Sequence, residues 1–134
     1  MKVYLFIALG TGIGGSARYA AMLAGQSFNP GAFPWDTVFV NVCGSLLIGC
    51  LAALFLSDSG QRRLSIHWEH FLMTGVCGGF TTFSFLSWQS LNLWMQQQHL
   101  AAAAFALANV VGSLMTVALG FALAQSYIPL LRAK

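Results

Sequence analysis

Charged side chains are scarce in this sequence of 134 residues. Six Lys and Arg and three Asp and Glu make up 7% of the chain, and the mean hydropathy is +0.72. Soluble domains carry about 25% charged residues, so a soluble fold of this size could not cover its surface with so few charges. The composition predicts an integral membrane protein surrounded by membrane lipid.

Carboxylates are missing from the interior of the apolar segments. Asp36 and Glu69 both lie at segment ends. A transporter driven by protons or sodium normally needs a carboxylate within the membrane to bind and release the coupling cation. The sequence therefore favours passive conduction. It also argues against the small four-helix multidrug exporters, which centre on a glutamate in the first helix.

The residues that several other functions require are missing from the sequence. The sequence contains no Ser-His-Asp set, metal-ligand cluster or nucleotide-binding loop. Cys43, Cys50 and Cys77 form an odd set inside apolar segments, at spacings that fit no zinc site, which indicates packing residues. The net charge of +3 comes without the basic stripe of a nucleic-acid-binding protein. We expect neither an enzyme nor a nucleic-acid partner.

What the sequence does contain is four apolar segments joined by short links. They cover about residues 3–25, 37–56, 71–95 and 100–124. Each is near the ~20 residues that a helix needs to cross the hydrocarbon core. No linker, repeat or low-complexity tract divides the chain. We predict one domain, residues 1–134, with an all-α fold of four transmembrane helices.

The third segment contains an unusual stretch, Gly75–Phe85. Its residues include three glycines, three hydroxyl side chains and three phenylalanines. Glycine weakens a helix interior, and hydroxyl groups need partners in hydrocarbon. We predict that the helix breaks at the Gly78-Gly79 pair and exposes backbone and hydroxyl groups to something small and polar.

The chemistry of this break allows two kinds of ligand. Exposed carbonyls of a broken helix suit a small cation such as Na⁺. The positive edges of phenylalanine rings, together with amide and hydroxyl donors from Asn41, Thr82 and Ser84, suit a small anion. Phe83 adjoins the break, and we expect its ring to contribute to the anion site.

Polar residues also occur on the other segments. Arg18 is costly in a membrane segment, and it either snorkels to the interface or has a structural or functional partner. Ser45 follows Asn41 by four residues and shares its helix face. The fourth segment has a polar stripe at helical spacing, which indicates a pore or a packed polar interface, formed by Asn109, Gly112, Ser113 and Thr116.

Four motifs together resemble the CrcB/Fluc fluoride channels: Gly14–Tyr19, Val40–Ser45, Gly78–Ser84 and Gly112–Thr116. The resemblance covers all four segments. It implies an antiparallel, dual-topology dimer with two pores in the inner membrane of a cell, and passive export of fluoride that lowers its toxicity in the cytoplasm. It also implies a structural Na⁺ held at the two-fold axis by the backbone carbonyls of Gly78 and Thr81.

The resemblance further implies a fluoride pathway of phenyl rings, an amide and hydroxyls: Phe83, Asn41, Thr82, Ser84, Ser113, Thr116 and Phe80. The sequence departs from the family at two positions, where Leu86 replaces the second pore phenylalanine and Gln89 replaces a glutamate. Two alternatives stay open, of which the first is consistent with these departures. One is a non-conducting or accessory subunit of a heterodimeric fluoride channel, and the other, less favoured, is a small four-helix exporter.

The basic residues bias the orientation of the chain. Five basic residues lie on the side of the N-terminus: Lys2, Arg62, Arg63, Arg132 and Lys134. The two loops on the other side contain no Lys or Arg. A dual-topology protein needs a weak bias, because the positive-inside rule otherwise determines its orientation. We therefore expect cytoplasmic termini, and a heterodimer with an oppositely oriented homologue in preference to a homodimer.

Expression of this chain alone tests the pairing. Reporter fusions at the C-terminus should show one orientation, because the basic residues favour one side of the membrane. Fluoride efflux, followed with a fluoride electrode, should reach its full rate only when an oppositely oriented homologue is co-expressed. Full efflux from this chain alone, together with mixed topology, would contradict the heterodimer.

Overall fold

The computed structural model describes residues 2–28, 33–56 and 65–132. Every regular element within these ranges is a helix and none is a strand, which confirms the predicted all-α fold. The basic residues Arg62, Arg63 and Lys134 lie outside the described residues, as does the side chain of Arg132, so the predicted charge bias is described only at Lys2.

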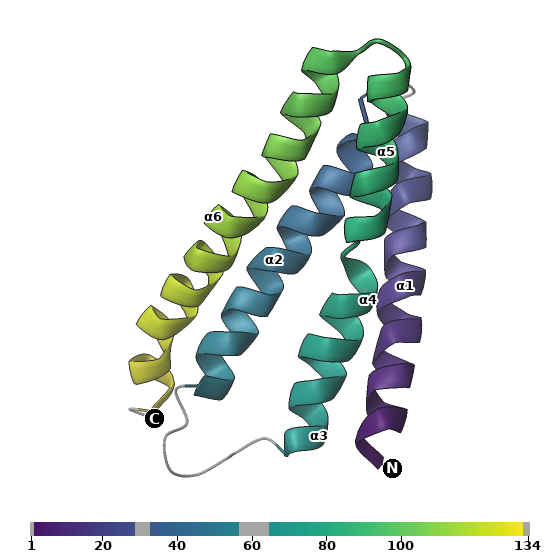
Figure 1. Cartoon of the computed structure of the whole chain (residues 1–134). Coiled ribbons are helices and arrows are strands. Elements are labelled where there is room, and N and C mark those ends of the chain that lie inside the picture. The colour runs from purple at the N-terminus through teal and green to yellow at the C-terminus, as the bar shows by residue number, and fades with distance from the viewer. Residues whose placement is uncertain (1, 29–32, 57–64, 133–134) are drawn as a thin grey trace.

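The helices form four segments, and the third is interrupted (Figure 1). The first segment is α1 (Lys2–Phe28), the second is α2 (Trp35–Leu56) and the fourth is α6 (His99–Arg132). The third runs through α3 (Ile66–Glu69), the π-helix η1 (His70–Cys77), α4 (Gly78–Phe80) and α5 (Phe83–Met95). Both chain termini lie at the same end of the bundle, and α2 and α6 run parallel.

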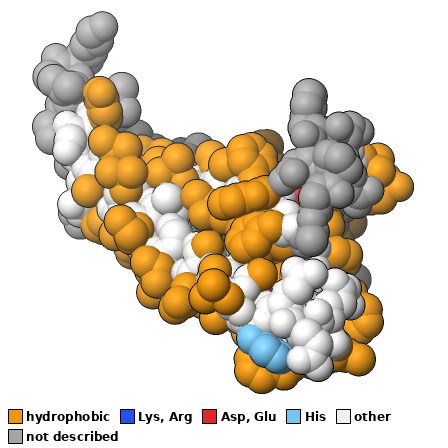
Figure 2. Space-filling view, turned by 90° about the horizontal axis from the view of Figure 1, so that it is seen from above, with side chains coloured by type: hydrophobic (Ala, Val, Ile, Leu, Met, Phe, Trp, Pro, Cys, Tyr) orange, Lys and Arg blue, Asp and Glu red, His pale blue; other side chains and the backbone are white. Residues whose placement is uncertain are grey.

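Three helical stretches of the described residues are long and apolar enough to cross a membrane: Trp35–Leu56, Ile66–Met95 and His99–Tyr127. The first segment is not among them. At 27 residues α1 has the length, but its glycines, Ser16 and Arg18 lower its hydropathy. The chain is a multi-pass membrane protein, and hydrophobic side chains cover much of the face shown in Figure 2.

Glycines join these segments into two closely packed pairs. In the first pair, α1 packs against η1 and α4. A Cβ atom on Gly10 would lie 2.9 Å from the Cα of Gly75, so the two backbones nearly touch. In the second pair, α2 packs along α6, where a Cβ on Gly49 or Gly120 would overlap a backbone carbonyl of the facing helix. Small residues commonly allow such close approach between membrane helices.

The two halves of the third segment belong to different pairs. The first half, η1 and α4, packs on α1, whereas α5 packs on α6. Between α5 and α6 lies a small apolar core, against which Phe33, Val38 and Ala101 pack. The core consists of Leu86, Leu93, Ala102 and Phe105. The interruption between α4 and α5 therefore lets one segment connect the two pairs.

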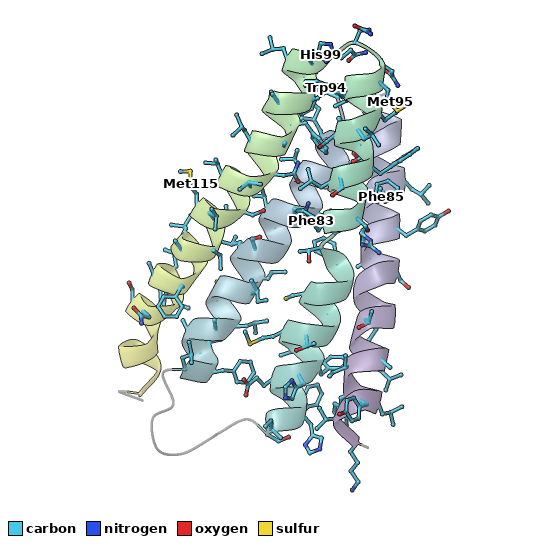
Figure 3. The ribbon with its side chains drawn as sticks, viewed as in Figure 1. Phe83, Phe85, Trp94, Met95, His99 and Met115 are labelled. Carbon is cyan, nitrogen blue, oxygen red and sulfur yellow. The ribbon has the colours of Figure 1, made fainter. Side chains whose placement is uncertain are left out.

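Aromatic rings mark both ends of the bundle. At the end that carries the termini, Phe6 packs edge-on against Trp68, with ring centroids 6.0 Å apart. At the other end, Trp94 lies over His99 at 4.3 Å, beside the turn between α5 and α6 (Figure 3). Tryptophan is enriched where membrane meets water, so these rings agree with a bundle that crosses the bilayer lengthwise.

The glycine packing predicts opposite effects for two substitutions in α1. A methyl group at Gly14 would overlap the carbonyl of Val76 and lie 2.9 Å from the backbone nitrogen of Phe80. Gly14→Ala should therefore lower the free energy of unfolding by about 1–3 kcal/mol. Denaturant titration in detergent, followed by tryptophan fluorescence, measures the change.

Gly12→Ala is the matched control on the same helix. A Cβ at Gly12 meets nothing within 4 Å, so the variant gains helix propensity of up to about 1 kcal/mol without a clash. Equal stabilities of the two variants would show that α1 does not pack against the third segment in this way.

Candidate ion-binding site

The third segment breaks at Thr81 and Thr82, one turn later than predicted. Thr81 (φ −81°, ψ 161°) and Thr82 (φ −151°, ψ 119°) are both extended. The Gly78-Gly79 pair, where we predicted the break, is helical and has no positive φ. These glycines serve close packing instead, because a Cβ on Gly79 would lie 2.6 Å from the carbonyl oxygen of Thr11.

Threonine side chains complete the ends on either side of the break. The Thr82 hydroxyl caps α5 by accepting the Phe85 backbone N–H at 3.1 Å, which suits threonine at an N-cap. On the other side, the hydroxyl and the backbone N–H of Thr81 each donate to the carbonyl of Cys77 at 3.0 Å. The break is therefore an ordered change of direction with its own hydrogen bonds.

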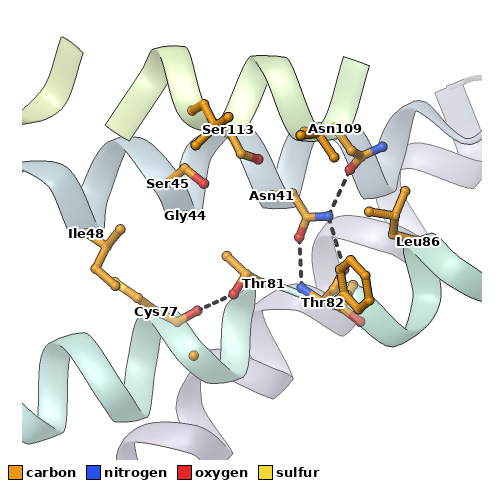
Figure 4. Close-up of a pocket in the computed structure, with 14 residues that line it drawn as sticks. Asn41, Gly44, Ser45, Ile48, Cys77, Thr81, Thr82, Leu86, Asn109 and Ser113 are labelled. Carbon is orange, nitrogen blue, oxygen red and sulfur yellow. Dashed lines mark hydrogen bonds between the residues drawn. The ribbon is translucent and has the colours of Figure 1, made fainter. Parts of the chain in front are cut away.

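Asn41 of α2 replaces the helical partner of Thr82 (Figure 4). In a continuous helix, the Thr82 N–H would donate to the carbonyl of Gly78. Here it donates to Asn41 Oδ1 at 2.8 Å, while Asn41 Nδ2 donates to the Thr82 carbonyl at 3.1 Å. The side-chain amide thus makes two hydrogen bonds to one residue of the break, and it frees the Gly78 carbonyl from its usual donor.

A second amide fixes Asn41. Asn41 Nδ2 also donates to Asn109 Oδ1 at 2.8 Å, and Asn109 Nδ2 donates to the carbonyl of Phe105 at 2.9 Å. Asn41 is 7% exposed and Asn109 is 1% exposed. Both amide hydrogens of Asn41 are therefore already used, and its contribution at this site is to hold the backbone of the break.

Arg18 reaches the break from α1. Its Nη1 donates to the carbonyl oxygen of Thr81 at 3.1 Å. This carbonyl lies at the C-terminal end of α4, where a helix presents partial negative charge that a cation stabilises. Arg18 therefore has a partner at the break, which is one of the two alternatives predicted for it.

A pocket of about 450 Å³ opens beside the break, between α2, α6 and the third segment. It brings together six residues of the predicted site: Asn41, Gly78, Thr81, Thr82, Phe83 and Ser113. Its other walls are apolar side chains such as Ile48, Val110 and Leu114, and no carboxylate lines it. Chemically, the pocket offers neutral donors and hydrocarbon, which suits a small ion that has lost its water.

Three predicted residues lie outside this pocket. The hydroxyl of Ser84 pairs with that of Thr82 at 3.2 Å. The hydroxyl of Thr116 lies 2.8 Å from its own helix carbonyl at Gly112 and 3.1 Å from the carbonyl of Val42, so it helps to join α6 to α2. The ring of Phe80 lies against Gly44 of α2.

Phe83 and Leu86, which occupy the two positions where the resemblance implies pore phenylalanines, differ sharply in exposed fraction. Phe83 begins α5 and is 77% exposed, whereas Leu86 is 7% exposed and belongs to the core between α5 and α6. Phe83 lies beside the gap between α2 and α5 (Figure 3). A single chain therefore places one ring at the rim of the pocket and fills the second position with an aliphatic side chain.

The predicted site residues did not include Gly44, Ser45 or Asn109, although the sequence placed Ser45 on the Asn41 face and Asn109 in the polar stripe. All three line the pocket. Gly44 is required because a Cβ there would overlap the side chain of Thr81. The signal for the other two is a shared spacing: Asn41 precedes Ser45 by four residues, and Asn109 precedes Ser113 by four.

The fold and the pocket together define a multi-pass membrane protein with a neutral polar site beside a broken helix. Its sequence matches the family model described as CrcB-like protein, Camphor Resistance (CrcB), over residues 5–121. The chain belongs to this family, as the four motifs predicted.

Individual relatives agree over nearly the whole length. The chain is 41% identical to a protein of Paramagnetospirillum magneticum over 120 residues, which cover 90% of this chain and 93% of the relative. It is 38% identical to a protein of Granulibacter bethesdensis over 128 residues, 96% and 98% of the two chains. It is 44% identical to a protein of Opitutus terrae over 116 residues, 86% and 83%. All three relatives are named "Fluoride-specific ion channel FluC", so the family is one of ion channels and not of enzymes.

The hydrogen bonds of Asn41 predict a large cost for removing its side chain. Asn41→Ala leaves the N–H and the carbonyl of Thr82 without partners in a buried position, which should lower the free energy of unfolding by about 3 kcal/mol. Asn92→Ala, at an exposed asparagine of α5, is the matched control and should change it little. Denaturant titration compares the two variants, and equal stabilities would exclude the role of Asn41 at the break.

Proposed function

We propose that this chain is a subunit of a fluoride-specific ion channel of the inner membrane and exports fluoride passively from the cytoplasm. The observation that carries the proposal is the pocket at the break, which offers neutral donors and a phenyl ring but no carboxylate. Relatives named as fluoride-specific channels, aligned over nearly the whole chain, support it.

Passive export follows from the membrane potential. A negative interior drives an anion outward by about 2.3 kcal/mol per charge per 100 mV. Fluoride that enters as the neutral acid HF accumulates as F⁻ inside the cell, so a conductance for F⁻ lowers the cytoplasmic concentration without an energy source. The conductance must exclude chloride, and a narrow path with few fixed donors achieves this.

The residues at the break take different parts in this pathway. Phe83 presents its ring at the rim, where the positive ring edge attracts an anion. Ser113 and the hydroxyls of Thr82 and Ser84 follow the pocket and its edge, whereas Asn41 acts as a positioning residue through the backbone of Thr82. Thr116 and Phe80 support the packing around the pathway.

The functional unit in this proposal is an antiparallel dimer, either a homodimer or a heterodimer with an oppositely oriented homologue. The 77% exposure of Phe83 supports it, because the ring lacks a cover within its own chain. An inverted second subunit would enclose the pocket and add a ring from the other side.

A structural Na⁺ at the dimer axis completes the proposal. Among the described residues, no group of His, Cys, Asp and Glu side chains could hold a metal ion, so the donors would be the backbone carbonyls of Gly78 and Thr81. The Gly78 carbonyl has lost its helical donor at the break. A carbonyl oxygen has two lone pairs, so Thr81 can accept from Arg18 and still face a cation.

A second candidate function is a non-conducting or accessory subunit of such a heterodimer. Leu86 favours it, because this residue lines the pocket and places an aliphatic side chain where the resemblance implies a second pore phenylalanine. Gln89 adds to it, because it replaces a glutamate of the family pattern. A small four-helix exporter is disfavoured, because no carboxylate lines the pocket.

Substitution of Phe83 tests the channel. In liposomes that hold the conducting dimer, Phe83→Ile should abolish fluoride efflux, because an aliphatic side chain lacks the positive ring edge that faces the anion. Folding should persist, since the side chain is exposed. A fluoride electrode measures the efflux, and size-exclusion chromatography checks the fold.

Phe85→Ile provides the control for that substitution, since Phe85 lies two residues further along α5 and does not line the pocket. It should leave fluoride efflux close to that of the unmodified chain. Unchanged efflux in Phe83→Ile would remove the ring from the pathway. Absence of efflux from the unmodified dimer would favour the accessory subunit.

A further inference from the structure

Two matched pairs of polar residues lie one helical turn apart where α2 and α6 run side by side. Asn41 and Asn109, separated by 68 residues, form the first pair and are hydrogen-bonded to each other. Ser45 and Ser113 have the same separation and lie four residues further along the same parallel helices. Both serines line the pocket (Figure 4). The register therefore places a pair of hydroxyls directly after the pair of amides.

We propose that Ser45, together with Ser113, binds the permeating anion in this pocket. This inference rests on the proposed fluoride conduction and adds Ser45 to its pathway. The two hydroxyls form a binding position for a small, desolvated anion. On α2 this position lies between Asn41 and Ile48 (Figure 4).

Two features together distinguish Ser45 and Ser113 from the other described serines: neither donates to its own helix, and both line the pocket. A lone serine in a membrane helix usually donates to the carbonyl four residues earlier. Ser16, Ser87 and Ser126 do so, at 2.8, 3.0 and 3.0 Å. Within the described residues, the structure records no such bond for Ser45, Ser113 or the buried Ser90, and of these three only Ser45 and Ser113 line the pocket. Their hydroxyl hydrogens are therefore free to point into the pocket.

The occupied groups around the pair favour an anion over a cation. Asn41 Oδ1 already accepts from the Thr82 N–H, and Asn109 Oδ1 accepts from Asn41, so these oxygens are not open to a cation. Of the other lining residues, Ile48 and Leu114 are apolar and offer no ligand, and the carbonyls of Gly78 and Thr81 are those proposed above to face Na⁺. Two hydroxyl donors in hydrocarbon suit a small anion, because a hydrogen bond to a charged partner is strong where water is excluded.

Three variants test the proposal in liposomes that contain the conducting dimer. Ser45→Ala should reduce fluoride efflux by about tenfold or more, the effect of losing one hydrogen bond to a charged group. Ser45→Thr keeps the hydroxyl and should recover most of the loss. Ser126→Ala is the matched control, because that hydroxyl bonds its own helix away from the pocket, and it should conduct like the unmodified chain.

A binding measurement separates this inference from the proposed function. Sodium fluoride is titrated into the purified dimer, and the ¹⁹F line width reports bound fluoride. Loss of binding in Ser45→Ala supports the hydroxyl pair even where the unmodified dimer does not conduct, a result that refutes the channel alone. Normal binding and efflux in Ser45→Ala, or equal losses in Ser45→Ala and Ser45→Thr, would overturn the role of the Ser45 hydroxyl.

Discussion

The structure depends on one backbone amide, the N–H of Thr82, which has no helical acceptor. In hydrocarbon such a group costs several kcal/mol unless it finds a partner within the protein. Asn41 Oδ1 accepts this N–H, and Asn41 Nδ2 donates to the Thr82 carbonyl. Because Asn109 then orients Asn41, three segments of the chain meet at one residue. The break can exist in a membrane because α2 and α6 carry these two amides.

The break in turn connects the two closely packed pairs of segments. Glycines bring α1 against η1 and α4, and other glycines bring α2 against α6. The third segment starts in the first pair and ends in the second, so its direction changes where the pairs meet. The pocket lies at this junction. Its walls come from both pairs, and close packing of the kind seen within each pair resists compression.

Much of this arrangement could be predicted from the sequence, and its errors have physical causes. The four helical segments follow from length and hydropathy, and an interruption near Gly75–Phe85 follows from its composition. The position of the break could not be read from glycine content, because Gly79 serves contact with Thr11 and remains helical. The role of Asn41 at the break depends on which backbone atoms it meets, 41 residues away. Nor could Ser45 be distinguished from a serine that bonds its own helix, because that choice depends on the neighbouring segment.

The long separation between the break and its partners has a consequence for biosynthesis. The hydrogen bonds that complete the break join residues 41, 63 and 68 positions apart. When the third segment enters the bilayer, α1 and α2 have already been synthesised, so Arg18 and Asn41 are present to receive it. The last segment follows and adds Asn109. The order of the helices along the chain thus supplies each partner before or soon after the exposed amide needs it, and the chain never has to hold an open break alone in lipid.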